Sequence, residues 1–314
     1  MERGNEKILI HIGLDKCGST AIQASFKRNQ AAFDAAGVVY PTTGKLCGHH
    51  VSLANLFGFG FVKIEEEHAE ELRSCLEAEI KNARTVVLSS EHFSYACSEE
   101  GIRKLAAFCS GFEVRIVLVL RNQIDWLEAQ YSETIKWGNQ QTFEDFLAEN
   151  VDGADYSELL RQWEACFDGR IKLLIFDAEP EELVLRFHQL VGTADLSPPQ
   201  KKKHNVSPSA VVMEIIRKVN SLNRQSEVSQ ETYDNLKRIQ SDIMAIADRE
   251  KTVGSNFKWS SQAVARLREF EAGNQAIAKK YLGKKDLFPE SMGAYIHRNV
   301  SDEKNIDNSQ AADQ

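Results

Sequence analysis

The stretch that decides the fold, Lys7–Thr20, reads KILIHIGLDKCGST. Its first half, Lys7–Gly13, is an apolar run rich in β-branched residues and predicts a buried strand. Gly13 and Gly18 then frame a short loop, and an amphipathic pattern over Ser19–Ala36 predicts a helix. A strand, a glycine-containing loop and a helix in this order can bind phosphate, because loop N–H groups converge and the helix N-terminus favours an anion. The alternative is a plain strand–turn–helix connection without a ligand.

The loop agrees with a nucleotide-binding loop in its glycines but not in its lysine. Gly13 and Gly18 have the spacing of GxxxxGK[ST], and Ser19 and Thr20 supply hydroxyl groups. Lys16 lies two residues before the second glycine instead of directly after it. We expect a lysine at this position to project from the loop itself, over a bound anionic group.

Strand and helix patterns alternate along the first two thirds of the chain. Further strands are predicted at residues 38–40, 85–90, 114–120 and 171–176, and further helices at 65–81, 99–109, 123–137 and 156–167. Such alternation is typical of a mostly parallel sheet covered on both faces. The predicted fold class is therefore α/β, with a parallel sheet flanked by helices, of the P-loop nucleotide-binding type.

From about Pro208 onward the strand signals stop. Amphipathic patterns predict helices at residues 209–221, 230–249 and 260–281. Because these helices need an apolar surface to cover, we expect one α/β domain over residues 1–298, with a helical C-terminal appendage at about 208–285. A separate helical domain is the alternative. Residues 299–314 are polar and predict a disordered tail.

Composition excludes several classes of protein. The chain of 314 residues has 46 acidic and 38 basic side chains and a net charge of −8, so a globally basic nucleic-acid binder is disfavoured. The longest apolar run, Val114–Leu120, is interrupted by Arg115 and far too short to span a bilayer. The polar start, MERGNEK, has no signal-peptide pattern, and the six cysteines have no zinc-finger spacing. We expect a cytoplasmic protein with no membrane span and no nucleic-acid partner; the oligomeric state stays open.

A second anion-binding signal follows the strand predicted at residues 114–120. Kinases and triphosphatases usually end a later strand in an Asp that holds Mg²⁺, but here the next residue is Arg121. An arginine in this place favours a second anion that is held without a metal.

Two segments of the chain together resemble the PAPS-dependent sulfotransferases, particularly bacterial relatives of the carbohydrate sulfotransferases. They are Lys16-Cys17-Gly18-Ser19-Thr20 and Val117–Tyr131 (VLVLRNQIDWLEAQY). In that family the first segment binds the 5′-phosphosulfate of PAPS (3′-phosphoadenosine 5′-phosphosulfate), and the second binds its 3′-phosphate. The resemblance implies PAPS as the cofactor without a metal, and transfer of a sulfuryl group to a hydroxyl acceptor such as a glycan. The cofactor-binding residues that we expect are Lys16, Cys17, Gly18, Ser19, Thr20, Arg121, Ser132 and Lys203.

The last two of these residues mark departures from the family pattern. Eight residues after Arg121 the family has a Ser, whereas this chain has Ala129. Ser132, about one helical turn further on, is the nearest hydroxyl and the expected substitute. Lys203 lies in a basic loop that lacks the family's glycine, so it either closes over a 3′-phosphate or is simply solvated.

Lys16, Glu91 and His92 are the catalytic candidates. Lys16 is expected to stabilise the transferring group, while Glu91 and His92 follow a strand at the sheet edge that faces ligands in open α/β folds. The resemblance favours Glu91 as the base, although His92 has the more suitable intrinsic pKa. His49 and His50, in the loop after residue 41, either contact the acceptor or only pack.

The sequence leaves two alternative functions open. One is a P-loop kinase or NTPase, and the other is a non-catalytic nucleotide- or glycan-binding relative.

Overall fold

The computed structural model describes residues 6–95, 99–177, 179–195, 209–222, 229–250 and 257–290. The chain forms two compact units. Unit 1 comprises residues 1–122 and 156–201, and unit 2 comprises residues 123–155 and 202–314. Over the described ranges, no helix has the length and apolar character needed to cross a membrane.

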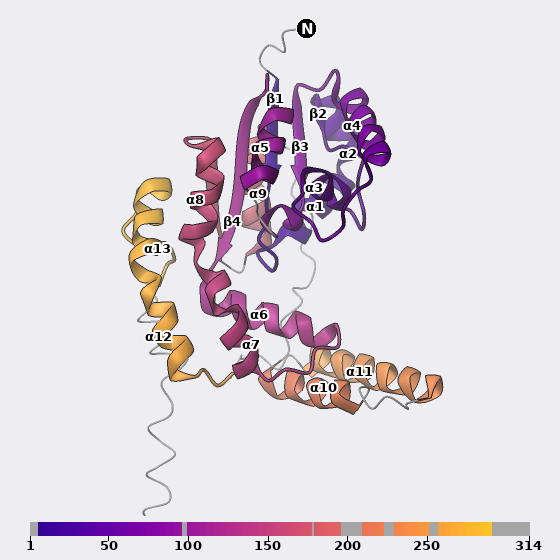
Figure 1. The fold of residues 1–314 in the computed structure, drawn as a ribbon, viewed down its shortest axis with the longest axis vertical. Helices are drawn as coiled ribbons and strands as arrows, with labels where there is room; N and C mark the ends of the chain where they lie inside the picture. The colour runs from indigo at the N-terminus through magenta and orange to yellow at the C-terminus, as the bar shows by residue number, and fades with distance from the viewer. Residues whose placement is uncertain are drawn as a thin grey trace, which may run out of the picture. The chain divides into compact units, whose positions relative to one another are not determined.

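Unit 1 is built on a parallel five-stranded sheet with strand order β2-β3-β1-β4-β5 (Figure 1). Its strands are β1 (Lys7–His11), β2 (Val38–Val39), β3 (Thr85–Ser89), β4 (Glu113–Arg121) and β5 (Ile171–Phe176). All five lie where the apolar runs predict them, which confirms the α/β, P-loop-like fold class. Every residue of β3 is buried, because helices cover both faces of the sheet.

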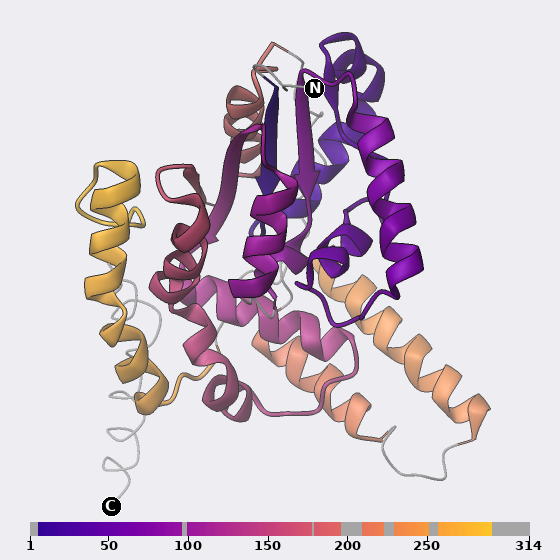
Figure 2. The same ribbon diagram turned by 45° about the horizontal axis from the view of Figure 1, so that its top comes forward.

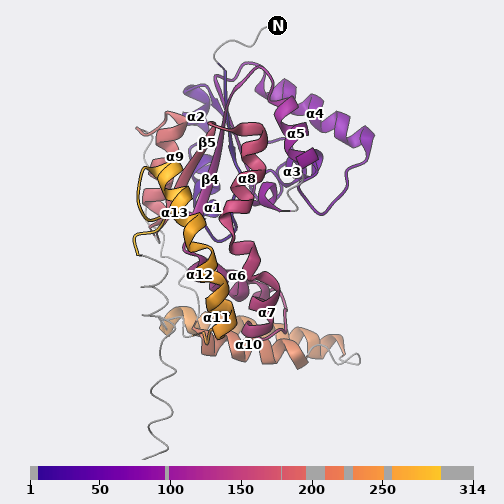
Figure 3. The ribbon, with the colours of Figure 1, turned by 60° about the vertical axis from the view of Figure 1, so that its left-hand side comes forward.

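Helices cover the two faces of this sheet. On one side lie α1 (Ser19–Arg28), α2 (Gln30–Ala35) and α9 (Pro180–Val191); on the other lie α3 (Val51–Phe57), α4 (Glu66–Ile80), α5 (Glu99–Phe108) and α8 (Tyr156–Phe167) (Figure 3). The prediction of one helix over 19–36 was wrong, because Asn29 leaves helical geometry (φ −111°, ψ 21°) and separates α1 from α2. The sequence analysis missed α3 and α9, although α9 has a proline at its start and Gly192 after its end.

The carboxyl edge of the sheet brings three distant segments together. Beyond the end of β1, Leu14 donates its N–H to the carbonyl of Val119 (3.2 Å), and Val119 donates to the carbonyl of Gly13 (2.9 Å). On the other side of β1, Ser90 donates its N–H to the carbonyl of His11 (3.1 Å). The chain leaves β1 toward β2 and leaves β4 toward β5, on the opposite side. This reversal of direction is where open α/β sheets bind ligands.

Unit 2 is helical in its described part. It contains α6 (Gln123–Lys136), α7 (Phe143–Asn150), the short turn η2 (Val151–Ala154), α10 (Ala210–Leu222), α11 (Gln230–Glu250), α12 (Ser261–Glu269), α13 (Glu271–Ile277) and the π-helical turn η3 (Ala278–Leu282). The helices α10 and α11 lie side by side (Figures 1 and 2) and confirm two of the C-terminal predictions. The single helix predicted over 260–281 is instead the succession of α12, α13 and η3.

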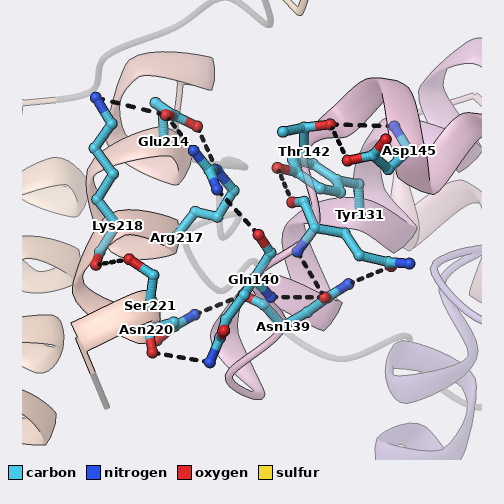
Figure 4. A network of polar contacts seen from close by, with 11 residues as sticks. Tyr131, Asn139, Gln140, Thr142, Asp145, Glu214, Arg217, Lys218, Asn220 and Ser221 are labelled. Carbon is cyan, nitrogen blue, oxygen red and sulfur yellow. Dashed lines mark hydrogen bonds and ion pairs between the residues drawn. The ribbon is translucent and has the colours of Figure 1, made fainter. Parts of the chain in front are cut away.

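Polar contacts join α10 to the turn that follows α6 (Figure 4). The Asn220 side-chain amide donates to the carbonyls of Ile135 (2.7 Å) and Asn139 (2.9 Å). Arg217 donates to the carbonyl of Gln140 (3.0 Å). These bonds satisfy carbonyl groups of the last turn of α6 and of the turn that follows it. They connect residues 123–155 with the C-terminal helices, whereas the sequence analysis placed this segment in the α/β part.

The predicted domain boundaries of 1–298 and 299–314 stay predictions, and residues 299–314 lie outside the described residues.

Candidate functional site

The loop between β1 and α1 has a backbone that only glycine adopts easily at two positions. Gly13 and Gly18 have φ values of +97° and +83°, and Lys16 between them also has a positive φ of +57°. A Cβ atom on Gly18 would lie 2.7 Å from Leu183 Cδ2, and one on Gly13 would lie 3.1 Å from the Cα atom of Glu91. Both glycines are therefore required by conformation and by close packing, and the strained Lys16 marks the loop as a site candidate.

The start of α1 is suited to an anion. Its N-cap, Gly18, provides no side-chain hydrogen bond, and its first turn contains no acidic residue, so neither of these offsets the partial positive charge of the helix N-terminus. The Ser19 hydroxyl is buried and donates to the carbonyl of Leu14 (3.1 Å), whereas Thr20 is exposed. Cys17 is fully buried, and burial raises the pKa of its thiol, so a contribution to anion binding would come from its backbone N–H.

Two predicted cationic residues meet at this loop. The Arg121 guanidinium, at the end of β4, donates to the backbone carbonyl of Lys16 (3.1 Å). The Arg121 backbone carbonyl accepts a hydrogen bond from the Tyr156 hydroxyl (2.8 Å), and its guanidinium lies 5.5 Å from the centre of the Phe176 ring. A guanidinium has five N–H donors, and the carbonyl of Lys16 needs one of them. Residues 105 positions apart in the chain thus meet at the loop.

Glu91 follows β3 and lies on the other side of the loop. Its Oε2 atom accepts hydrogen bonds from Gln23 Nε2 (3.0 Å) and from His49 Nδ1 (3.2 Å). Burial by itself would raise the pKa of Glu91, but the His49 contact, its own backbone N–H and the nearby His11 together lower the pKa to about 2. The carboxylate is therefore ionised at neutral pH and is a weak base.

His50 explains why His49 lies beside Glu91. His50 is fully buried, donates its backbone N–H to the carbonyl of Ser89 (2.8 Å), and accepts the N–H of Ser89 at Nδ1 (3.0 Å). Its Nε2 atom lies 2.9 Å from the carbonyl of Pro41, which assigns the proton to Nε2. Burial lowers the pKa of His50 to about 4, so the ring is neutral. These hydrogen bonds hold the loop that contains His50 against the end of β3, and the neighbouring His49 consequently reaches Glu91.

His92, the other base candidate, is less well connected. Its ring centre lies 5.8 Å from that of His49, and its buried Nδ1 atom has no hydrogen-bond partner. Burial, followed by the charge of His49, lowers the pKa of His92. We find no contact of the His92 ring with Glu91 comparable to that of His49.

Beneath the site lies a buried polar pair that the sequence analysis did not identify. His11 Nδ1 lies 2.8 Å from the hydroxyl of Ser89, which also lies 3.3 Å from Gln23 Nε2. Burial lowers the pKa of His11 to about 4 despite the nearby Glu91. His11 stands inside an apolar strand pattern, and only the register of β1 against β3 pairs it with Ser89.

Two predicted cofactor residues, Ser132 and Lys203, belong to unit 2. Ser132 is 2% exposed, and its hydroxyl donates to the carbonyl of Glu128 within α6 (2.8 Å), so binding a phosphate requires it to leave that bond. Ala129, at the position of the family's serine, lies on the same helix. Lys203 lies outside the described residues. The roles of Ser132 and Lys203 stay predictions.

Comparisons with known proteins identify few relatives. No family model matches the chain. An uncharacterized protein of Archaeoglobus fulgidus is 25% identical over 209 residues, which are 65% of this chain and 55% of that protein. The chain thus spans about half the length of this curated relative. A solved chain from the PezAT chromosomal toxin–antitoxin system of Streptococcus pneumoniae is 14% identical, covers 77% of this chain and 87% of its own length, and has a TM-score of 0.29. A similarity at that score carries no argument about ligand or reaction.

Proposed function

We propose that this chain binds PAPS at the loop of residues 13–20 and transfers its sulfuryl group to a hydroxyl acceptor. The observation that carries the proposal is the hydrogen bond from Arg121 to the backbone of Lys16, which places a second cation against the loop. An uncapped helix N-terminus and two cationic side chains fit a ligand with two anionic groups. The resemblance of both segments to the sulfotransferases selects PAPS among such ligands.

The residues around the loop have distinct parts in this reaction. Bound PAPS supplies a sulfuryl group whose S–O bond to phosphate breaks as the acceptor oxygen bonds to sulfur. Lys16 and the N–H groups at the start of α1 stabilise the negative charge that collects on the phosphate. Thr20, exposed in the first helical turn, offers a further hydroxyl donor to the same group.

The proton of the acceptor needs a base, and the pair of His49 and Glu91 suits this role better than Glu91 alone. A carboxylate with a pKa of about 2 accepts a proton poorly. By holding His49 at Nδ1, however, Glu91 fixes the ring so that Nε2 carries the lone pair. We therefore assign proton acceptance to His49 Nε2 and positioning to Glu91, in place of the sequence-based choice between Glu91 and His92.

Calorimetric titration with PAP, the desulfated product of PAPS, tests the proposal. We expect PAP to bind without a metal, and Arg121→Ala to weaken its affinity about tenfold or more, because a hydrogen bond to a charged group contributes roughly 1.5–3 kcal/mol. Arg115→Ala is the matched control, since Arg115 lies on the same strand but forms an ion pair with Glu113. Absence of PAP binding, or equal effects of the two substitutions, contradicts the proposal.

Phosphotransfer from a nucleoside triphosphate is the second candidate. The glycine frame of the loop, with Ser19 and Thr20 beginning the helix of a parallel α/β fold, is shared with P-loop kinases and favours it. This function predicts tight ATP binding only when Mg²⁺ is present. Titration of ATP with and without Mg²⁺, alongside PAP, therefore separates the two candidates. If neither nucleotide binds, the non-catalytic alternative is favoured.

A further inference from the structure

A row of aromatic and imidazole rings connects the protein surface with Glu91. Phe61, which is 78% exposed, has its ring centre 5.5 Å from that of Tyr95. The Tyr95 ring lies 5.0 Å from His92, and His92 lies 5.8 Å from His49. His49 then contacts the Glu91 carboxylate through Nδ1 (3.2 Å). We call these four rings the aromatic row.

Three separate segments of unit 1 supply the aromatic row. His49 lies in the loop before α3, Phe61 in the loop between α3 and α4, and His92 and Tyr95 in and after the turn η1 (Glu91–Ser94). Centroid separations of 5–6 Å lie in the range that stabilises aromatic pairs. An exposed ring that is packed against a second ring next to a candidate site differs from a scattered surface hydrophobe, which needs no explanation.

We propose that the aromatic row is a subsite for a neutral saccharide. A sugar ring has a face of C–H groups, which packs on an aromatic ring, and a rim of hydroxyls, which bind polar atoms. The row offers both chemistries, because Phe61 and Tyr95 supply ring faces while His92 and His49 supply ring nitrogens. A purely apolar ligand would instead offer no partner to the ring nitrogens of His92 and His49, which is unfavourable.

The charges close to Phe61 in the sequence favour a neutral sugar over an acidic one. Glu65, Glu66 and Glu67 are exposed and begin four residues after Phe61, with Lys63 as the only basic residue between Phe61 and Glu67. Glu91 adds a buried negative charge at the inner end of the row. A polysaccharide with many carboxylate or sulfate groups would be repelled by this surface. The subsite deepens and rests on the proposed function, since it leads a sugar hydroxyl to His49.

Saturation-transfer NMR with the full chain tests the subsite directly. The probes are neutral hexasaccharides of glucose, N-acetylglucosamine and mannose, compared with hyaluronan and heparin fragments. We expect at least one neutral probe to bind through ring C–H protons, and Phe61→Ala and Tyr95→Ala each to weaken its binding about tenfold. Trp137→Ala is the matched control, because Trp137 is an aromatic residue with 82% exposure that contributes no ring to the row. We expect this variant to bind the saccharide as the parent does.

The outcomes separate this inference from the proposed function. PAP binding is measured on the same variants and should be unchanged in Phe61→Ala and Tyr95→Ala, which also shows that they are folded. Saccharide binding without PAP binding would support the subsite and contradict the sulfotransferase proposal. Absence of binding by every neutral probe, binding of only the acidic fragments, or equal effects of Phe61→Ala and Trp137→Ala would overturn the subsite.

Discussion

At the scale of single residues, the position of His49 determines what Glu91 can do. Glu91 is held by Gln23 and His49, and its pKa of about 2 makes it a stable anion. A stable anion orients a neighbouring imidazole well but accepts a proton poorly. The division of roles between the two side chains therefore follows from a contact that the order of residues in the chain does not reveal.

This division of roles predicts the kinetics of three variants. His49→Gln should lower the rate of PAP release from PAPS by roughly 10²–10⁴-fold, since this is what a general base contributes. Glu91→Gln should also lower the rate, because an amide oxygen is a weaker hydrogen-bond acceptor than a carboxylate and holds His49 Nδ1 less firmly. His92→Gln, which removes a ring without a carboxylate contact, should change the rate by only a few fold. A large loss in His92→Gln with normal turnover in His49→Gln would contradict the assignment.

At the scale of elements, the loop depends on the strand and helix behind it. Gly18, the N-cap of α1, packs against β5 and α9 through Phe176 and Leu183. The loop is thus held by two elements that lie more than 150 residues further along the chain. This packing fixes the position of the loop at the start of α1.

Two glycine substitutions separate backbone strain from this packing. Gly18 and Gly192 have nearly the same φ, +83° and +84°, but a Cβ on Gly192 meets no atom within 4 Å. Gly192→Ala should lower the free energy of unfolding by about 1–2 kcal/mol, the cost of left-handed backbone for an L-residue. Gly18→Ala should cost roughly 1–3 kcal/mol more, because its methyl group would overlap Leu183. Urea unfolding measures both, and equal losses would show that α9 can move aside.

Most helices and strands lie where the sequence predicts them, but two short helices and one break between helices do not follow from it. All five strands lie at the predicted positions, and the central strands β1, β3 and β4 are apolar runs because the sheet is covered on both faces. The short α3 and α7, of seven and eight residues, have too few turns for a clear amphipathic pattern and were missed. The break at Asn29 was also missed, because helix propensity does not locate where a chain must turn to reach β2.

At the scale of the whole molecule, unit 1 contains three buried neutral histidines. His11, His50 and His188 are each at most 1% exposed, and burial lowers the pKa of each to about 4. In an unfolded chain a histidine titrates near 6.5. Between pH 6.5 and 4 the unfolded state therefore binds more protons than the folded state, and stability falls as the pH falls.

The resulting pH dependence of stability is measurable. Above pH 7 we expect a nearly constant free energy of unfolding, and between pH 7 and 5 a decrease of about 2 kcal/mol for each of the three histidines. Denaturant unfolding at several pH values measures this slope. His188→Gln should remove one histidine's share of it, whereas the exposed His68→Gln should leave it unchanged. A flat profile from pH 7 to 5 would show that these side chains are not buried as neutral groups.

The sequence by itself determined the parallel α/β architecture, the glycine-framed loop before α1 and the C-terminal helices, because these depend on local patterns of apolar residues, glycines and caps. It also indicated Lys16, Glu91 and Arg121 as site candidates, since each follows a predicted strand at one edge of the sheet. Only the tertiary structure decided that Arg121 reaches the Lys16 backbone and that His49 holds Glu91. Those contacts join residues 42 to 105 positions apart, and their distances depend on strand order and loop packing, which no local pattern specifies.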